Sequence, residues 1–417
     1  MKKIHYSWVI LSIVFISIIV AGITRSSSGV FIIPFENEFG WERTEISIAI
    51  GLNLLMYGLS GPFMGAFVQI IGVKKMMIIS MFTMAIGLAL SLVMSETWHL
   101  LILWGILIGL GASLFLTVLS PIIANRWFHQ RRGLAIGILT ASTATGQLVL
   151  LPVVAYVVEA SSWRFSIFII LVLALLTIIL LIVFMKEFPK DIGLSPYGGE
   201  ATVSASKLAT RNPFSLAIKT LFEAFKYREF WLLAGSFFIC GLSTSGLIGT
   251  HFIAYCIGFG IASVTAASML SVMGVFDLVG TTVSGWLSDK IDNRWLLFWY
   301  YLLRGLSLLL LPIALFDGSF VLLIVFSLFY GLDWIATVPP TINIARNVFG
   351  IEKSVIVYGW IFTAHQMGAA TAALGGGLVF ERFNDYTSAF IGAGILCFLA
   401  SLSVIIIRKK YALPVKG

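Results

Sequence analysis

The sequence predicts an all-α membrane protein with twelve transmembrane helices in two pseudo-symmetric six-helix bundles. Three observations lead to this fold class. Hydrophobic residues make up 59% of the 417 residues and charged residues only 11%, whereas soluble domains carry roughly a quarter charged residues. The chain contains twelve apolar runs of the length needed to cross a bilayer core of about 30 Å. In addition, short sequence elements of the first half recur in the second half at one fixed interval.

The repeat joins the segment from Gly65 to Lys75 with the segment from Gly285 to Arg294. In each copy a glycine closes an apolar run and a basic residue follows nine positions later. Phe39-Gly40 and Phe259-Gly260 are separated by the same interval. One interval in two places indicates that the chain consists of two copies of one half, an organisation that many membrane carriers share.

Each apolar run is interpreted as a helix, because backbone groups inside a bilayer must pair within their own segment. The first six runs predict a bundle in residues 1–186, and the last six predict a bundle in residues 229–417 that ends in a short cytoplasmic tail. The polar residues 187–228 predict a cytoplasmic linker; its apolar part, 214–225, is expected to lie on the membrane surface. The predicted helices are 7–35, 45–70, 75–95, 98–123, 133–158, 164–186, 229–256, 262–288, 294–315, 319–344, 354–379 and 386–408.

The distribution of lysine and arginine predicts the orientation. Of the 27 such residues, only Arg43, Arg164 and Arg382 fall in predicted outer loops, and Arg25 and Arg304 fall inside predicted helices. Because positive residues gather on the cytoplasmic side, both termini are expected in the cytoplasm, and the protein is expected in the plasma (cytoplasmic) membrane. The net charge of +8 follows from this asymmetry and does not indicate a nucleic-acid partner.

Several function classes lack their motifs in this sequence. It contains no Gly-x4-Gly-Lys-Ser/Thr loop for a nucleotide, no His-Glu-x2-His and no Gly-x-Ser-x-Gly, and this excludes the common ATP-driven pumps, zinc proteases and serine hydrolases. The three cysteines have no metal-binding spacing and are expected to be small buried side chains. We therefore predict a transporter, not an enzyme, with no cofactor or metal, that works as a monomer in the lipid bilayer.

Five ionisable residues lie inside predicted helices, where each is a candidate for function because charge is costly in a bilayer. Asp277 and Arg304 fall at equal depth on consecutive helices. They predict either a structural salt bridge or a switch in which Asp277 binds a proton and releases Arg304 or the substrate. Asp333 precedes Pro339-Pro340, which should bend its helix, and it is the best candidate for a proton site. The alternative for Asp333 is a hydrogen bond to a neighbouring helix.

The remaining two ionisable residues are His365 and Arg25. His365 could carry protons near neutral pH or simply be a hydrogen-bonded residue. Arg25 presents a planar guanidinium that matches a carboxylate, so it is predicted to anchor an anionic substrate; the alternatives are pairing with a protein acid or a place in an outer gate. Further polar or aromatic residues that could face a cavity are Asn53, Tyr57, Gln147, Trp334 and Trp360, with helix packing as the alternative for each.

The two repeated loops resemble the Gly-x3-Asp-Arg/Lys-x-Gly-x-Arg/Lys element that follows helices 2 and 8 of the major facilitator superfamily. The resemblance covers the whole chain and implies the major facilitator fold, with a central cavity and loops that brace the halves and take part in gating. The C-terminal copy keeps Asp289, Lys290 and Arg294, with Asp292 in place of the second glycine. The N-terminal copy keeps Gly65, Gly72 and Lys74 but has Gln69-Ile70 where the family has Asp-Arg.

Two passages are similar to the monocarboxylate transporter and oxalate/formate antiporter branch. They are Phe39-Gly40-Trp41-Glu-Arg43-Thr44-Glu-Ile-Ser47 and Phe276-Asp277-Leu-Val-Gly-Thr281. Carriers of this branch have Asp-x3-Arg at the second place; this chain keeps Asp277 but has Thr281 at the Arg position. The resemblance implies transport of a small organic anion such as a monocarboxylate by alternating access. Without a nucleotide-binding loop the energy must come from an ion gradient, and the protonatable residues Asp277, Asp333 and His365 make H+ the expected coupling ion, with Na+ as the alternative. A reading from another class is an intramembrane enzyme or a non-transporting sensor. Alternatives are a proton-driven exporter of amphipathic compounds and a carrier of a zwitterionic metabolite.

Overall fold

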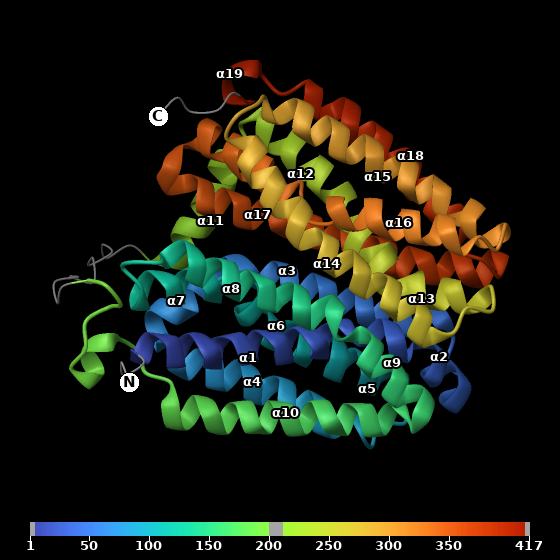
Figure 1. Cartoon of the computed structure of the whole chain (residues 1–417), viewed down its shortest axis with the longest axis horizontal. Helices are drawn as coiled ribbons and strands as arrows, with labels where there is room; N and C mark the ends of the chain where they lie inside the picture. The colour runs from blue at the N-terminus through green and yellow to red at the C-terminus, as the bar shows by residue number, and fades with distance from the viewer. Residues whose placement is uncertain (1–4, 200–211, 413–417) are drawn as a thin grey trace.

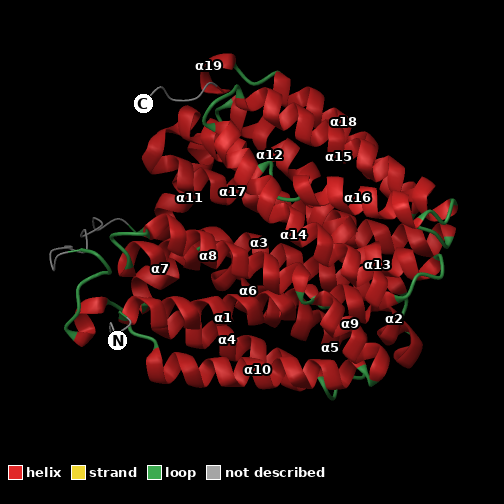
Figure 2. Cartoon of the chain, viewed as in Figure 1, coloured by secondary structure: helices red, strands yellow, loops and turns green. Residues whose placement is uncertain are grey.

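The computed structural model describes residues 5–199 and 212–412, and nearly all of this part of the chain is helical (Figures 1 and 2). The predicted all-α fold is therefore confirmed. Eleven helical stretches among the described residues are long and apolar enough to cross a membrane. The one predicted run not among these eleven, 354–379, is the part of helix α17 (Val338–Phe383) that follows a break at Gly350, where φ is 79°.

The N-terminal half contains six helical passes, several of which are made of more than one helix. The first pass is α1 and α2, which meet at Ser27. The fourth and fifth contain π-helical turns, η1 (Leu101–Ile108) and η2 (Thr145–Val149). The helices of this half are α1 (Tyr6–Ser26), α2 (Ser28–Phe39), α3 (Arg43–Ile71), α4 (Val73–Ser91), α5 (Thr97–Leu100), α6 (Gly109–Thr117), α7 (Leu119–Trp127), α8 (Arg132–Ala144), α9 (Leu151–Ala160) and α10 (Trp163–Phe184).

The C-terminal half repeats this plan. Its first pass contains the π-helical turn η4 (Leu242–Ile248), and its fourth pass is interrupted between α16 and α17. The helices of this half are α12 (Arg228–Gly241), α13 (Gly249–Gly258), α14 (Ser263–Ser288), α15 (Asn293–Phe316), α16 (Phe320–Asp333), α17, α18 (Thr387–Ile405) and α19 (Lys409–Ala412).

Local sequence explains where several helices begin and end. The hydroxyls of Ser162 and Ser319 accept hydrogen bonds from the amides of Phe165 and Leu322 and so cap α10 and α16, because the first amides of a helix have no partner within it. Gly40 ends α2 with φ of 68°, a conformation that glycine adopts without steric cost. These signals keep the breaks between passes short.

The two halves lie side by side along the length of the bundle, with the N-terminal half in blue to green and the C-terminal half in yellow to red (Figure 1). The start of α1 and helix α19 lie at the same end of the bundle, which we call the terminal end. The other end, which contains the turns at Gly40 and Asn384, is called the opposite end. These names are independent of the orientation in a membrane.

Glycines let helices of the two halves pack closely. A Cβ atom on Gly51 of α3 would lie 3.2 Å from the carbonyl oxygen of Ala370 in α17, and one on Gly29 of α2 would lie 3.0 Å from the carbonyl oxygen of Gly249 in α13. Small residues permit such backbone contact between membrane helices. The contacts between α2 and α13 and between α3 and α17 join the two halves.

The segment between the halves is divided between them. Its first part, which includes the 3-10 turn η3 (Pro189–Ile192), packs on the N-terminal half: the amide of Tyr197 donates to the carbonyl of Trp127 at 2.9 Å. Its last part is helix α11 (Pro213–Ala224). The ring of Phe214 stacks on Phe63 of α3, while the carbonyl of Ala217 accepts a hydrogen bond from Trp360 of α17. Helix α11 therefore contacts both halves at the terminal end.

Candidate functional site

A pocket of about 40 Å³ lies between the two halves. Its polar lining consists of Arg25, Asn53, Gln147 and the hydroxyl residues Ser26, Ser28, Ser245 and Thr250; the rest is Trp334 and aliphatic side chains. The volume has room for a few water molecules. A larger ligand therefore requires side chains or the two halves to move apart.

Arg25 is the charged residue of this pocket. It is on the last turn of α1 and is 8% exposed. Its guanidinium lies 4.4 Å from the centre of the Tyr57 ring, a cation–π contact. Among the described residues no carboxylate pairs with it, and its Nε atom has no hydrogen-bond partner. The guanidinium is thus buried next to a polar pocket without an anion to balance its charge.

The other residues predicted to bind substrate are placed in different ways. Asn53, Gln147 and Trp334 line the pocket, and Tyr57 lies under Arg25. The Asn53 amide already donates to the carbonyl of Trp104 at 2.6 Å. Trp360 lies away from the pocket, where its indole nitrogen donates to Ala217 of α11 at 3.0 Å. Ser245 and Thr250 were not predicted from the sequence, since nothing distinguishes them from other hydroxyl residues on apolar helices.

Arg304 pairs with Asp333 and not with Asp277. Its Nε lies 2.6 Å from Asp333 Oδ2, and both side chains are buried. The predicted alternative of an Asp277–Arg304 salt bridge is therefore wrong. Equal depth on consecutive helices did not make these two residues partners, because the chain unwinds after α16 and brings the carbonyls of Asp333 and Trp334 to the guanidinium as well. The other oxygen of Asp333, Oδ1, has no hydrogen-bond partner among the described residues.

Asp277 occupies a different environment from Asp333. Its Oδ1 accepts a hydrogen bond from the Thr281 hydroxyl at 2.8 Å and another from the backbone amide of Ile335 at 2.9 Å. The side chain is 2% exposed and has no cation within salt-bridge distance in the described part of the chain. Thr281, which stands where the resembling carriers have arginine, thus serves here as a neutral donor to Asp277.

His365 is on α17, where its ring contacts α12, and it does not line the pocket. Its ring stacks on Phe362 and contacts Phe237, and its Nδ1 is 3.2 Å from the side-chain nitrogen of Gln366. This environment matches the alternative of a hydrogen-bonded residue packed among aromatic rings. No carboxylate of the described residues contacts its ring, and its role in proton transfer stays a prediction.

The two repeated loops cap the helices that follow them with different residues. In the C-terminal copy, Asp292 accepts from the amide of Arg294 at 3.0 Å and pairs with its guanidinium at 2.8 Å. In the N-terminal copy, Gly72 stands at the equivalent place with φ of 93°, and the carboxylate of Glu187 accepts from the amides of Val73 at 2.9 Å and Lys74 at 3.0 Å. Glu187 comes from beyond α10, so the sequence of the loop itself could not reveal it.

Glu187 also pairs with Arg126 at the end of α7. Partial burial opposes ionisation of this carboxyl, but the two backbone amides and the Arg126 guanidinium together hold its pKa below the ordinary value. The carboxylate cap that Asp292 provides in the C-terminal loop, and that the N-terminal loop lacks at Gly72, is thus supplied from the segment between the halves.

The other residues predicted to take part in gating are at the terminal end. Lys74 donates to the carbonyl of Ile182 at 2.8 Å, and the ammonium of Lys290 lies 3.9 Å from the centre of the Trp286 ring. Asp289 accepts from the Asn343 amide at 3.4 Å. A Cβ atom on Gly65 would meet nothing within 4 Å. In this conformation these residues make contacts within their own half.

Hydrogen bonds that join the two halves and involve a charged side chain occur at the opposite end. Arg43 of α3 pairs with Glu36 and donates to the hydroxyl of Tyr386 at 3.2 Å, and the amide of Thr44 donates to Glu381 at 2.7 Å. The Tyr386 hydroxyl is also 3.2 Å from Nδ1 of His251. This group, Glu36, Arg43, His251, Glu381 and Tyr386, is called the opposite-end cluster. It links the halves at that end.

The described residues contain no group of three or more His, Cys, Asp or Glu side chains placed to hold a metal ion. The chemistry of the site is therefore that of a binding pocket with one cation, neutral hydrogen-bonding groups and an indole. The two buried acids, Asp277 on α14 and Asp333 at the end of α16, do not line the pocket.

Comparison with known proteins agrees with this architecture. The sequence model described as Major Facilitator Superfamily matches residues 14–373 and 258–416. An uncharacterized MFS-type transporter of Bacillus subtilis (strain 168), YcxA, is 25% identical over 91% of this chain and 90% of its own length. Monocarboxylate transporter 12-B of Danio rerio is 26% identical over 97% of this chain and 88% of its own length.

The crystal structure of a D-xylose-proton symporter has the same fold. It superposes with a TM-score of 0.71 over 97% of this chain and 99% of that chain, at 14% sequence identity. The match to the family extends over more than half of the chain, and the multi-pass helical architecture agrees with it. The chain is a member of the Major Facilitator Superfamily, a transporter and not an enzyme.

Proposed function

We propose that this chain is a secondary active transporter that carries a small organic anion of the monocarboxylate type, coupled to protons. It works as a monomer in the cytoplasmic membrane, with both termini in the cytoplasm. The single observation that carries the proposal is Arg25, a buried cation beside the pocket that no carboxylate within residues 5–199 and 212–412 neutralises.

The physical argument concerns the free energy of an isolated charge. An arginine in the centre of a membrane helix costs at least about 2.5–3.5 kcal/mol on insertion scales. A carboxylate in the pocket would offset this cost and form a two-pronged hydrogen bond with the guanidinium. The hydroxyls and the Gln147 amide around it suit the remaining polar atoms of such a ligand.

Asp277 is the proposed proton site. Asp333 has Arg304 as its counter-ion and His365 is packed among rings, whereas Asp277 is buried with only neutral donors. A buried carboxylate without a cation gains most from binding a proton. Transport then moves an anion and a proton together, which carries no net charge for a monocarboxylate.

Similar proteins support this substrate class. Relatives with 23–27% identity are named monocarboxylate transporters 12 and 13. This chain differs from the resembling carriers in lacking an arginine at Thr281, so its anion would be anchored from the N-terminal half by Arg25.

A thermal-shift screen of the purified protein tests the substrate class. We expect acetate, lactate or pyruvate to raise the unfolding temperature of the wild type but not of Arg25→Ala, while Trp360→Phe, outside the pocket, keeps the response. Stabilisation by alanine but not by these acids would favour a zwitterion. Stabilisation by tetraphenylphosphonium alone would contradict the proposal and favour an exporter of amphipathic compounds.

Proton coupling is tested in proteoliposomes with the acid identified by that screen. An inward proton gradient should drive accumulation in the wild type. Asp277→Asn should lose accumulation but keep exchange of labelled for unlabelled substrate, because exchange needs no net proton movement. Accumulation that persists in Asp277→Asn would overturn the role of Asp277.

A further inference from the structure

The chain between α16 and α17 is not helical, and its backbone groups need partners inside the membrane. Residues Trp334–Thr337 form turns between the two helices. Pro339 and Pro340 have no amide hydrogen, so the carbonyls of Ile335 and Ala336 lack their usual donors four residues later. An unpaired backbone group in a bilayer costs several kcal/mol. Each group at this break must therefore be paired by other means.

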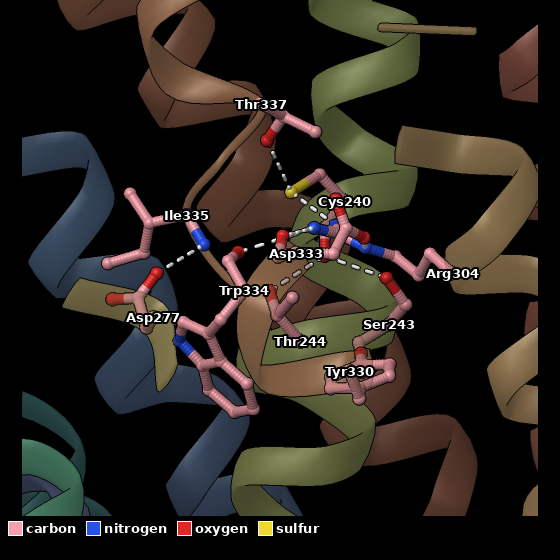
Figure 3. A network of polar contacts seen from close by, with 10 residues as sticks. All are labelled: Cys240, Ser243, Thr244, Asp277, Arg304, Tyr330, Asp333, Trp334, Ile335 and Thr337. Carbon is pink, nitrogen blue, oxygen red and sulfur yellow. Dashed lines mark hydrogen bonds and ion pairs between the residues drawn. The ribbon is translucent and has the colours of Figure 1, made fainter. Parts of the chain in front are cut away.

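The carbonyl of Ile335 accepts from the amide of Val338 at 2.9 Å, and Figure 3 shows side chains that serve as partners for other groups of the break. The carbonyl of Gly331, four residues before Ile335, accepts a hydrogen bond from the amide of Trp334 at 3.1 Å. The amide of Ile335 instead donates to Asp277 Oδ1 at 2.9 Å. The carbonyl of Trp334 accepts from the Arg304 guanidinium at 3.3 Å, and the carbonyl of Asp333 also accepts from it. The hydroxyl of Ser284 donates to the carbonyl of Ala336 at 2.5 Å.

The two charges have the signs that the broken helix requires. The carbonyl end of a helix is negative and its amide end is positive. Arg304 lies at the carbonyl end of α16, and Asp277 accepts an amide on the approach to α17. Cys240 adds a third support, since its sulfur is 2.7 Å from Arg304 Nη1 and 3.4 Å from the Thr337 hydroxyl.

Helix packing fixes Asp277 at this position. A Cβ atom on Gly280 would lie 1.8 Å from the carbonyl oxygen of Leu332, and one on Gly331 would lie 2.7 Å from the backbone of Met273. The backbones of α14 and α16 therefore touch on both sides of Asp277. At the break itself, Trp334 turns its side chain to the pocket that contains Arg25.

We propose that Asp277 and Arg304 are positioning residues that act through the backbone of the break and hold Trp334 as a wall of the Arg25 pocket. Neither residue needs to touch the substrate. The inference rests on the proposed function only in taking this pocket as the substrate site. It assigns to Asp277 an acceptor role that is separate from the charge used for proton coupling.

The distinction between acceptor and charge gives the test. Asparagine keeps an oxygen that can accept the Ile335 amide but has no charge, whereas leucine has neither. We would label the full-length protein with 5-fluorotryptophan, reconstitute it in nanodiscs without substrate, and record fluorine NMR spectra. The Trp334 resonance is identified by its loss in Trp334→Phe.

We expect Asp277→Asn to leave the Trp334 resonance at the wild-type shift and Asp277→Leu to move it or broaden it. Ser284→Ala, which removes the donor to Ala336, should move it by less, and so keeps the test available if Asp277→Leu does not fold. The matched control is Thr282→Val, whose exposed hydroxyl bonds only within α14. Arg304→Lys should also move the resonance, because an ammonium lacks the fork that reaches both carbonyls.

An unchanged Trp334 resonance in both Asp277→Leu and Ser284→Ala would overturn the inference. So would an equal displacement in Asp277→Asn and Asp277→Leu, since the charge of Asp277 and not its acceptor oxygen would then control Trp334. The spectra are recorded without a transported ligand. The Trp334 resonance can therefore be interpreted even if the anion proposal fails. Likewise, the thermal-shift test of the anion proposal does not depend on the outcome of the NMR experiment.

Discussion

Arg25 and Arg304 are both arginines buried inside membrane helices, yet their surroundings are opposite. Arg304 is 1% exposed and its guanidinium contacts a carboxylate, two backbone carbonyls and a thiol. Arg25 is 8% exposed and faces a ring and a pocket, with no anion among the described residues. Burial and residue type do not separate a structural charge from a binding charge. The groups that each guanidinium contacts do separate them: Arg304 in the C-terminal half contacts a carboxylate, and Arg25 in the N-terminal half contacts a ring.

Removal of Arg304 should have the largest effect on stability. Arg304→Ala leaves Asp333 as an uncompensated buried charge and two carbonyls without donors, so we expect the free energy of unfolding to fall by about 3–5 kcal/mol. Denaturant titration in detergent would measure this loss. The double variant Arg304→Leu, Asp333→Leu should recover part of it, because no charge is left unpaired. If Arg304→Ala and the wild type had equal free energies of unfolding, Arg304 would not be a structural charge, and its predicted difference from Arg25 would be wrong.

Removal of Arg25 should affect transport and not stability. Loss of hydrogen bonds to a charged group costs about 1.5–3 kcal/mol, so the apparent KM of Arg25→Ala for its anion should rise roughly 10- to 150-fold. The unfolding temperature should stay the same or increase, because an unpaired charge is removed. Uptake kinetics and thermal unfolding of the same preparation would measure both. A large loss of stability with unchanged KM would make Arg25 structural, like Arg304.

The opposite-end cluster offers a smaller effect on the balance of conformations. Tyr386→Phe removes the hydroxyl that joins Arg43 and His251. A hydrogen bond contributes about 0.5–1.5 kcal/mol, so the population open at the opposite end should increase roughly two- to tenfold.

Spin labels at Ser161 and Phe320, which are exposed, would report this change as a distance distribution. The cysteines of the described chain are buried and should not take the label. Tyr255→Phe is the matched control, because its hydroxyl bonds to Thr387 within the C-terminal half. A similar shift in both variants would mean that the cluster does not link the halves.

The smallest expected effect is on the free energy of unfolding, when the carboxylate caps Glu187 and Asp292 of the two repeated loops are neutralised. Glu187→Gln should lower the free energy of unfolding by about 1 kcal/mol, and Asp292→Asn by less, because asparagine also caps helices. The pKa of Glu187 is depressed in the folded protein, so its contribution is present above its ordinary pKa of 4.5 and lost as pH falls through the lower folded pKa. Thermal unfolding against pH should therefore show the wild type and Glu187→Gln converging in acid. A constant difference at all pH values would exclude the ionised carboxylate as the cause.

The sequence predicted the passes, the two halves and the residues that carry buried charge, because apolar length and intramembrane charge are local properties. It did not predict which charges meet. Asp277 and Arg304 were predicted at the same depth in the membrane, but they do not pair with each other. Each instead binds the backbone at the break after α16: Arg304 donates to the carbonyl of Asp333, and Asp277 accepts from the amide of Ile335. The role of Glu187 was also hidden, since its target amides are more than one hundred residues earlier. Such pairings depend on how separate helices pack, which periodicity and composition do not encode.

The position of Glu187 has a practical consequence for dividing the protein. A fragment that stops at the end of the sixth pass would omit the carboxylate that caps α4 and the Tyr197 contact to Trp127. A fragment of residues 1–199 retains both. Co-expression of residues 1–199 with residues 200–417 is therefore the division that should reassemble. We therefore expect the first half to be stable only as a fragment that extends beyond its sixth pass to include Glu187 and Tyr197.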